Sequence, residues 1–119
     1  MAQVMIHNTN GKEDVERASL AFVVGNTALS SGQDATILLT IEGVRIATPG
    51  YADGLQAEGF APLRELIDKF VQNGGQIWVC GACAKPRQIT DETLIPGARI
   101  IGAATAVEAM VNGARVLSF

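Results

Sequence analysis

The sequence predicts an α/β fold of the flavodoxin-like type, a three-layer sandwich in which helices cover a sheet of about five mostly parallel strands. Short apolar segments bounded by turn residues alternate along the chain with segments in which apolar residues recur at helical spacing. A helical crossover between neighbouring strands makes them parallel. With 119 residues, of which 48% are hydrophobic, the chain suffices for one core and not for two, so we expect a single domain over residues 1–119.

The N-terminal part predicts a strand, a helix and a second strand. Residues 2–7 (Ala-Gln-Val-Met-Ile-His) form the expected first strand. Asn10 and Glu13 have the spacing of a helix-capping pair, and the helical period of the apolar residues then predicts a helix over residues 11–29. After a turn, the continuous apolar run at residues 35–41 is typical of a strand that is covered on both faces.

The middle of the chain predicts a long loop, a helix and a third strand. Residues 42–60 are rich in glycine and have no clean period, so we expect a turn and a loop, which at this length is usually functional or a subunit contact. Pro62 suits the first turn of an amphipathic helix that ends at the Asn-Gly-Gly sequence of residues 73–75. The third strand is expected at residues 77–79.

The C-terminal part predicts shorter elements. Residues 84–87 can hold only a short helix, because Pro86 is tolerated near a helix start and not deep inside a helix. The elements expected after it are a short helical piece at 90–95, a strand at 99–101, a helix from the capping pair Thr105 and Glu108 through Val111, and a last strand at 116–117.

The charge pattern argues against several classes of partner. Nine Lys and Arg against twelve Asp and Glu give a net charge of -3, and the basic residues are scattered, so we expect no binding to nucleic acid. No apolar run approaches the ~20 residues of a membrane span, and the N-terminal residues lack the pattern of a signal peptide. We therefore expect a cytoplasmic protein without a membrane partner.

The most informative chemical feature is the pair Cys80 and Cys83, which are the only two cysteines of the sequence. They lie where the apolar strand pattern gives way to a short helical pattern. Backbone N–H groups and the positive end of a helix favour the thiolate at such a junction, and this edge of an open parallel sheet is the usual place for chemistry. In a reducing compartment, closely spaced cysteines are more often catalytic, redox-active or metal-binding than structural.

The Cys-x-x-Cys spacing is compatible with several roles. A structural zinc needs four ligands, and His7 is the only histidine, so we expect no metal site within one chain. Thiol–disulfide exchange fits the spacing, although thioredoxin-like folds carry the motif after the first β-α unit. Sulfur carriage is a third possible role, and it needs only one nucleophilic cysteine that holds a persulfide. Either cysteine can also have no chemical role and pack as a small hydrophobic residue. We expect His7 to be structural, and Lys85 and Arg87 to be solvated surface charges.

The segment of residues 80–87, which we call the cysteine loop, resembles a known family. The apolar strand that ends in Cys80, the small-residue turn of residues 81–84 and the following Arg87 resemble the DsrE/DsrF-like family, which includes sulfur-relay subunits of the TusD type and YchN-type proteins. The resemblance covers the chain, since residues 38–47 resemble the family's second strand with its Gly-Val turn, and residues 95–102 resemble its late strand entry.

The resemblance implies a cytoplasmic sulfur-relay protein, a carrier of the sulfurtransferase type. Cys80 matches the family's sulfur-accepting cysteine, which holds sulfane sulfur as a persulfide and passes it to a partner thiol, and Cys83 would assist or resolve that persulfide. These two residues are the predicted catalytic residues, and no cofactor is implied. The implied partners are a protein sulfur donor, a protein sulfur acceptor and further copies of the chain in a homotrimer or homohexamer. A non-catalytic oligomeric module that binds or regulates partners and a dithiol redox protein stay open as alternatives.

Overall fold

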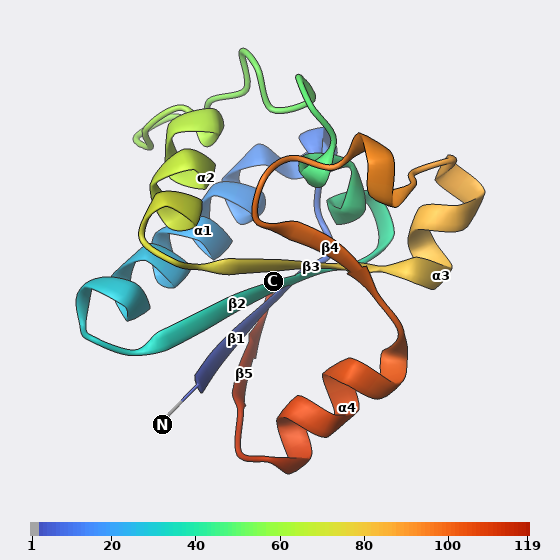
Figure 1. Ribbon diagram of the computed structural model, residues 1–119. Coiled ribbons are helices and arrows are strands. Elements are labelled where there is room, and N and C mark those ends of the chain that lie inside the picture. Colours follow the sequence, from blue (N-terminus) through green and yellow to red (C-terminus); the bar gives the residue numbers. More distant parts are fainter. Residues whose placement is uncertain (1–2) are drawn as a thin grey trace.

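The computed structural model describes residues 3–119 and has a sheet of five parallel strands in the order β4-β3-β2-β1-β5 (Figure 1). The strands are β1 (Gln3–Asn8), β2 (Asp34–Leu39), β3 (Gln76–Cys80), β4 (Ala98–Ile101) and β5 (Arg115–Ser118). The helices are α1 (Val15–Ser30), α2 (Leu63–Gln72), α3 (Gly81–Ala84) and α4 (Ala103–Val111). The predicted α/β class and parallel pairing are confirmed. The first residue of the strand predicted at 2–7 lies outside the described residues.

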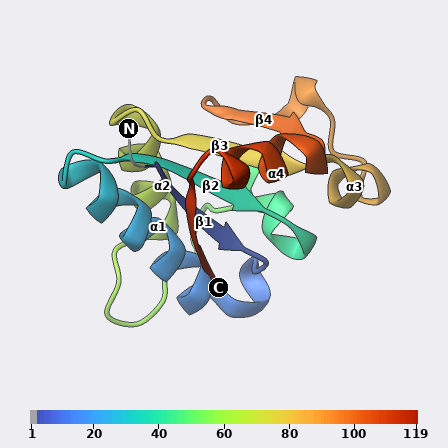
Figure 2. The same ribbon diagram turned by 90° about the horizontal axis from the view of Figure 1, so that it is seen from below.

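Helices cover both faces of the sheet and form the predicted three layers (Figure 2). α1 and α2 pack on one face, where the rings of Phe22 and Phe70 meet edge to face at 5.8 Å. α4 lies on the other face, where Ala106 belongs to a cluster with Met5 and Trp78. The first two crossovers step along the sheet in one direction, whereas α4 returns across the sheet from β4 to β5, and right-handed connections then place it on the opposite face. The strand order is not that of flavodoxin itself, where the first strand lies between the second and the third.

The first long helix begins later than predicted, at Val15. The Asp14 carboxylate accepts a hydrogen bond of 3.0 Å from the backbone N–H of Arg17, which satisfies one of the unpaired donors of the first helical turn. The predicted cap by Asn10 and Glu13 is therefore wrong, because a competing carboxylate stands at the position where the helical backbone starts. A short 3-10 turn fills the space between β1 and this cap.

The chain after β2 departs most from the prediction. It forms a 3-10 helix, η2 (Ile41–Ala47), where the sequence predicted the end of a strand over residues 35–41 and the start of a loop over residues 42–60. Gly43 is the reason, since a Cβ at this position would collide with the backbone carbonyl oxygen of Asn8. Only glycine lets the chain fold back so closely over the end of β1. The remainder of the predicted loop consists of turns and irregular structure up to α2.

The other predicted elements lie within a few residues of their expected places. α2 begins directly after Pro62, as the proline predicts. α4 begins at Ala103 after Gly102, and no side chain caps it. The predicted capping pair Thr105 and Glu108 is therefore wrong, because both residues already lie inside the helix.

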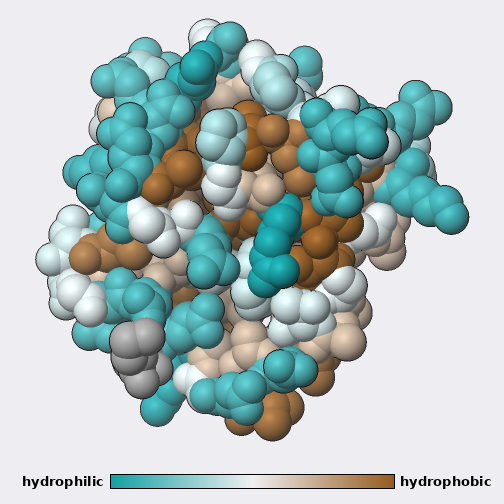
Figure 3. All heavy atoms as spheres, viewed as in Figure 1, coloured by the Kyte–Doolittle hydropathy of each residue, from teal (hydrophilic) through white to brown (hydrophobic). Residues whose placement is uncertain are grey.

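α4 carries exposed apolar side chains on its outer surface. Val107, Met110 and Val111 are 53%, 43% and 79% exposed, and Val116 of β5 is 45% exposed. We call these four residues the α4–β5 patch, and Figure 3 shows brown, hydrophobic atoms at the lower edge of the molecule where α4 lies. No helix among residues 3–119 combines the length and the apolar character that a bilayer crossing requires.

Candidate functional site

Cys80 is the last residue of β3, at the edge of the sheet where all five parallel strands end. β3 continues directly into α3, so the thiol lies at the strand-to-helix junction that the sequence predicts (Figure 1). Cys80 is paired with Ile101 of β4 in the strand register and packs against the main core while staying half-buried. The thiol is therefore partly accessible rather than sealed in the core.

Cys83 lies in α3, within the turn that follows Cys80. Both cysteines are free thiols of intermediate exposure. α3 has only four residues and continues into the 3-10 helix η3 (Lys85–Arg87), which contains Pro86 as the sequence predicts. A helix this short has a small macrodipole, because few peptide dipoles are aligned. Charged side chains also lie around the cysteine loop.

Arg87 is one of these charges, and the prediction that it is a solvated surface charge is wrong. Its side chain is 21% exposed. Its Nε donates to Oε1 of Glu42 at 2.8 Å, and its Nη1 donates to the backbone carbonyl oxygen of Cys83 at 3.0 Å. Arg87 therefore ties the cysteine loop to η2, whereas Lys85 is exposed as expected.

Glu42 lies between two guanidinium groups. Its Oε1 accepts from Arg87, and its Oε2 accepts from Nε of Arg45 at 2.9 Å. The hydrogen bond from Arg87 and then that from Arg45 hold the pKa of the Glu42 carboxyl below its usual range. Because two arginines share one carboxylate, the group carries a net positive charge next to the backbone of Cys83, and such a charge attracts anionic sulfur species.

Sequence reasoning missed Glu42, Arg45 and Ile41 as parts of this edge. Ile41 begins η2 with a backbone φ of 55°, and its side chain is 51% exposed. A β-branched residue with positive φ is rare, and backbone strain of this kind gathers at functional sites. The sequence signal for the turn was Gly43, whereas no local pattern announces the pairing of Glu42 with an arginine 45 residues away.

His7 bridges the ends of three strands. Its Nε2 lies 2.7 Å from Oγ1 of Thr40, which follows β2, and its Nδ1 lies 3.3 Å from Oγ of Ser118 in β5. Burial lowers the pKa of the imidazole, so the neutral form is favoured. The neutral ring thus has a hydroxyl partner at each nitrogen, and these contacts fix its orientation at the strand ends. That His7 is structural stays a prediction.

The arrangement offers thiol nucleophiles in a positively charged setting. Cys80 and Cys83 are both partly exposed to solvent. The two positive charges of Arg45 and Arg87 outnumber the one negative charge of the Glu42 carboxylate between them. Within residues 3–119, no three His, Cys, Asp or Glu side chains gather to hold a metal ion. Nucleophilic attack at sulfur is chemistry that such an arrangement can carry out.

The comparisons with known proteins establish the family of the chain. The sequence model of the DsrE/DsrF-like family matches residues 2–119, which confirms the resemblance. An uncharacterised protein of Methanocaldococcus jannaschii, MJ0760, is 31% identical over 103 residues, which cover 87% of this chain and 38% of that protein. An uncharacterised protein of Methanopyrus kandleri, MK0008, is 28% identical over 85 residues, which cover 71% of this chain and 67% of that protein. The chain thus spans less than half of the length of the first relative.

Solved structures share the fold at low sequence identity. The crystal structure of the ychN protein from E. coli matches with a TM-score of 0.81 over 100% of both chains, at 16% identity. A protein of unknown function from Methanobacterium thermoautotrophicum, MTH1491, matches with a TM-score of 0.74 over 100% of both chains, at 11% identity. At these identities the likeness establishes a common fold and nothing finer.

Proposed function

Because this chain belongs to the DsrE/DsrF-like family, we propose that it is a sulfur-relay protein in which Cys80 accepts sulfane sulfur as a persulfide and passes it to a partner thiol. The observation that carries the proposal is the position of Cys80, half-buried and reachable at the strand-to-helix junction, with a net positive charge on the adjoining loop. The family suggests a role related to sulfur relay, and the assignment to Cys80 is our own step.

The transfer is balanced without an external oxidant. The Cys80 thiolate attacks the outer sulfur of a donor persulfide, so that a new S–S bond forms on Cys80, the S–S bond of the donor breaks, and the donor leaves as a thiolate. An acceptor thiolate then attacks the outer sulfur on Cys80, and the Cys80 thiolate is restored. The partners that this chemistry requires are one protein sulfur donor and one protein sulfur acceptor.

Cys83 allows a second reaction of the persulfide on Cys80. Its thiolate can attack Sγ of the Cys80 persulfide, which forms a Cys80–Cys83 disulfide and releases the outer sulfur as hydrosulfide. The two cysteine sulfurs are oxidised and the outer sulfur is reduced, so a cellular dithiol must afterwards reduce the disulfide. We propose that Cys83 assists or resolves in this way, and that the protein works in the reducing cytoplasm, where free thiols persist.

Arg87 and Glu42 support the proposed site without reacting. The hydrogen bond of Arg87 to the Cys83 carbonyl oxygen and its ion pair with Glu42 hold the loop against η2. The second guanidinium, that of Arg45, gives the group the one positive charge that Glu42 does not neutralise, and this charge balances that of a persulfide anion. These residues are positioning residues.

Mass spectrometry of the purified protein after incubation with a persulfide donor tests the proposal. We expect an adduct of one sulfur atom on Cys80 in the native protein and in Cys83→Ser, and none in Cys80→Ser. A disulfide between the two cysteines under mild oxidation, with no sulfur adduct on Cys80 even in Cys83→Ser, would favour the dithiol redox protein. If neither modification forms, the non-catalytic oligomeric module is the better description, and the α4–β5 patch is the observation that favours it.

A further inference from the structure

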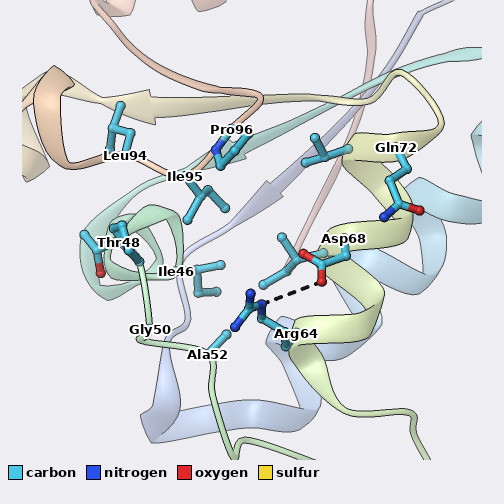
Figure 4. A pocket seen from close by; sticks show the side chains of 13 residues that line it. Ile46, Thr48, Gly50, Ala52, Arg64, Asp68, Gln72, Leu94, Ile95 and Pro96 are labelled. Atoms are coloured by element: carbon cyan, nitrogen blue, oxygen red, sulfur yellow. Dashed lines mark ion pairs between the residues drawn. The ribbon is translucent and has the colours of Figure 1, made fainter.

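A cavity of about 410 Å³ lies on the face of the sheet that carries α2, away from both cysteines. Its floor is apolar and buried, since Ile46, Ala52 and Ile67 are 1%, 5% and 3% exposed. Ile95 and Pro96, from the segment that precedes β4, form the opposite wall (Figure 4). The volume falls in the range of small-molecule sites, about 300–1,000 Å³.

The walls of the cavity are fixed by contacts of their own. The backbone N–H of Ile95 donates to the carbonyl oxygen of Ala47 at 2.8 Å, and this bond holds the wall formed by Ile95 and Pro96 against η2. Gly97, with a φ of 85°, brings the same segment against α2, because a Cβ there would lie 2.9 Å from the Val71 side chain. The site is therefore formed before any ligand arrives, which reduces the conformational cost of binding.

The charged groups of the lining, Arg64 and Asp68, lie at one end, on α2. Nε of Arg64 lies 3.6 Å from Oδ2 of Asp68 (Figure 4). Nη1 of Arg64 also contacts Oδ1 of Asp53 at 2.6 Å. Arg64 and Asp68 line the cavity, whereas Asp53 follows the lining residue Ala52 in the sequence and pairs with Arg64 without lining the cavity itself. Two carboxylates thus face one guanidinium, so this end carries a net negative charge. The long contact leaves the Asp68 carboxylate the less satisfied of the two acids.

We propose that this cavity binds a small apolar molecule that carries a cationic or hydrogen-bond-donating group at one end. The hydrocarbon or aromatic part would occupy the floor of Ile46, Ala52 and Ile67, and the donor would contact Asp68. An anionic head group is disfavoured, because Arg64 is already neutralised and the second carboxylate repels it. The proposal is independent of the sulfur relay, since no cysteine lines the cavity.

Three probes with one common apolar part test the charge preference: 4-phenylbutylamine, 4-phenylbutanol and 4-phenylbutanoate. Titrations followed by amide NMR shifts should show saturable changes at residues 48–52 and 94–97 for the amine and the alcohol. We expect the amine to bind at least about threefold more tightly than the carboxylate, a modest ratio because the charged groups are half exposed and screened. No saturable shift with any probe, or tighter binding of the carboxylate, overturns the proposal.

Variants separate the two parts of the site. Asp68→Asn should remove the preference for the amine and keep the affinity for the alcohol, and Ala52→Leu, which fills the floor, should weaken all three probes. Glu108→Gln, an acid-to-amide change on the exposed surface of α4, is the matched control and should change nothing. Unchanged binding in both Asp68→Asn and Ala52→Leu would also overturn the proposal. Cys80→Ser should bind the probes as the native protein does, so failure of the sulfur relay and failure of this site are distinguishable.

Discussion

Arg87 joins the cysteine loop to η2 through one hydrogen bond to Glu42 and one to the carbonyl oxygen of Cys83. Arg87→Gln removes both, and we expect the free energy of unfolding to fall by about 1 kcal/mol, because the pair is partly exposed and screened. Urea denaturation measures this change. Arg45→Gln is the matched control, since Arg45 is more exposed and makes only one side-chain bond to Glu42; its effect should be smaller. Equal effects of the two variants would contradict the idea that Arg87 joins the cysteine loop to η2 through these two hydrogen bonds.

His7 gives stability a pH dependence of its own. Its pKa in the folded protein is lowered by burial, so the unfolded chain binds more protons between that value and the ordinary value of about 6.5. The free energy of unfolding should therefore fall as pH decreases from about 7.5 through 6.5, and level off once the folded form is also protonated. Urea denaturation at pH 7.5, 6.5 and 5.5 measures this, and His7→Gln should flatten the dependence. The carboxyls with lowered pKa, Asp14 and Glu42, act only at lower pH.

At the residue scale, what the sequence predicts depends on how local the interaction is. Cys80 was placed correctly because the end of an apolar strand and the start of a helix are both local patterns. Arg87 was not, because its role depends on Glu42, 45 residues earlier, which only the folded chain brings to it. The position of His7 near a strand end could be predicted from the sequence, whereas its hydroxyl partners Thr40 and Ser118 come from two other segments.

At the scale of elements, η2 begins with a strained residue. Ile41 has a backbone φ of 55° and an exposed side chain. Asparagine tolerates this conformation better than a β-branched residue, so we expect Ile41→Asn to raise the free energy of unfolding by about 0.5–1 kcal/mol. Ile41→Ala is the control, because it removes the side chain and keeps most of the backbone strain. Thermal or urea unfolding compares them, and a gain no larger for Asn than for Ala would mean that strain is not stored here.

The elements differ in how well the sequence announces them. α2 was predicted at both ends, since Pro62 precedes its first residue and Gly74, with a φ of 91° that glycine favours, follows its C-terminal cap. The predicted cap of α1 was wrong because the Asp14 carboxylate competes for the same N–H groups, and that of α4 was wrong because the helix begins at Ala103 without a side-chain cap. η2 was missed because it depends on Gly43 packing on Asn8, a contact between the segment after β2 and the last residue of β1.

At the scale of the whole molecule, five parallel strands bring every strand end to one edge, and the cysteine loop, η2 and His7 meet there for that reason. The sequence predicts this edge, since alternating strands and helices imply parallel pairing. It does not predict the strand order, because the place of β5 beside β1 depends on α4 covering the second face of the sheet. The same helix is apolar on its outer side as well, which a helix at the surface of a monomer seldom is.

We expect the α4–β5 patch to be covered by further copies of the chain, as in the homotrimer or homohexamer implied by the family resemblance. Val111 is 79% exposed, and with Val107 and Met110 it forms a continuous apolar row at helical spacing. Exposing such a row to water is unfavourable, and association with another copy would bury it. Val111→Lys should therefore shift the protein toward smaller species in size-exclusion chromatography with light scattering, because each copy would bring a charge into the contact. Glu16→Lys, on the exposed surface of α1 on the opposite face, is the control and should leave the assembly unchanged. A native protein that is monomeric at micromolar concentration, or a Val111→Lys variant with the native mass, would mean that this surface serves another partner.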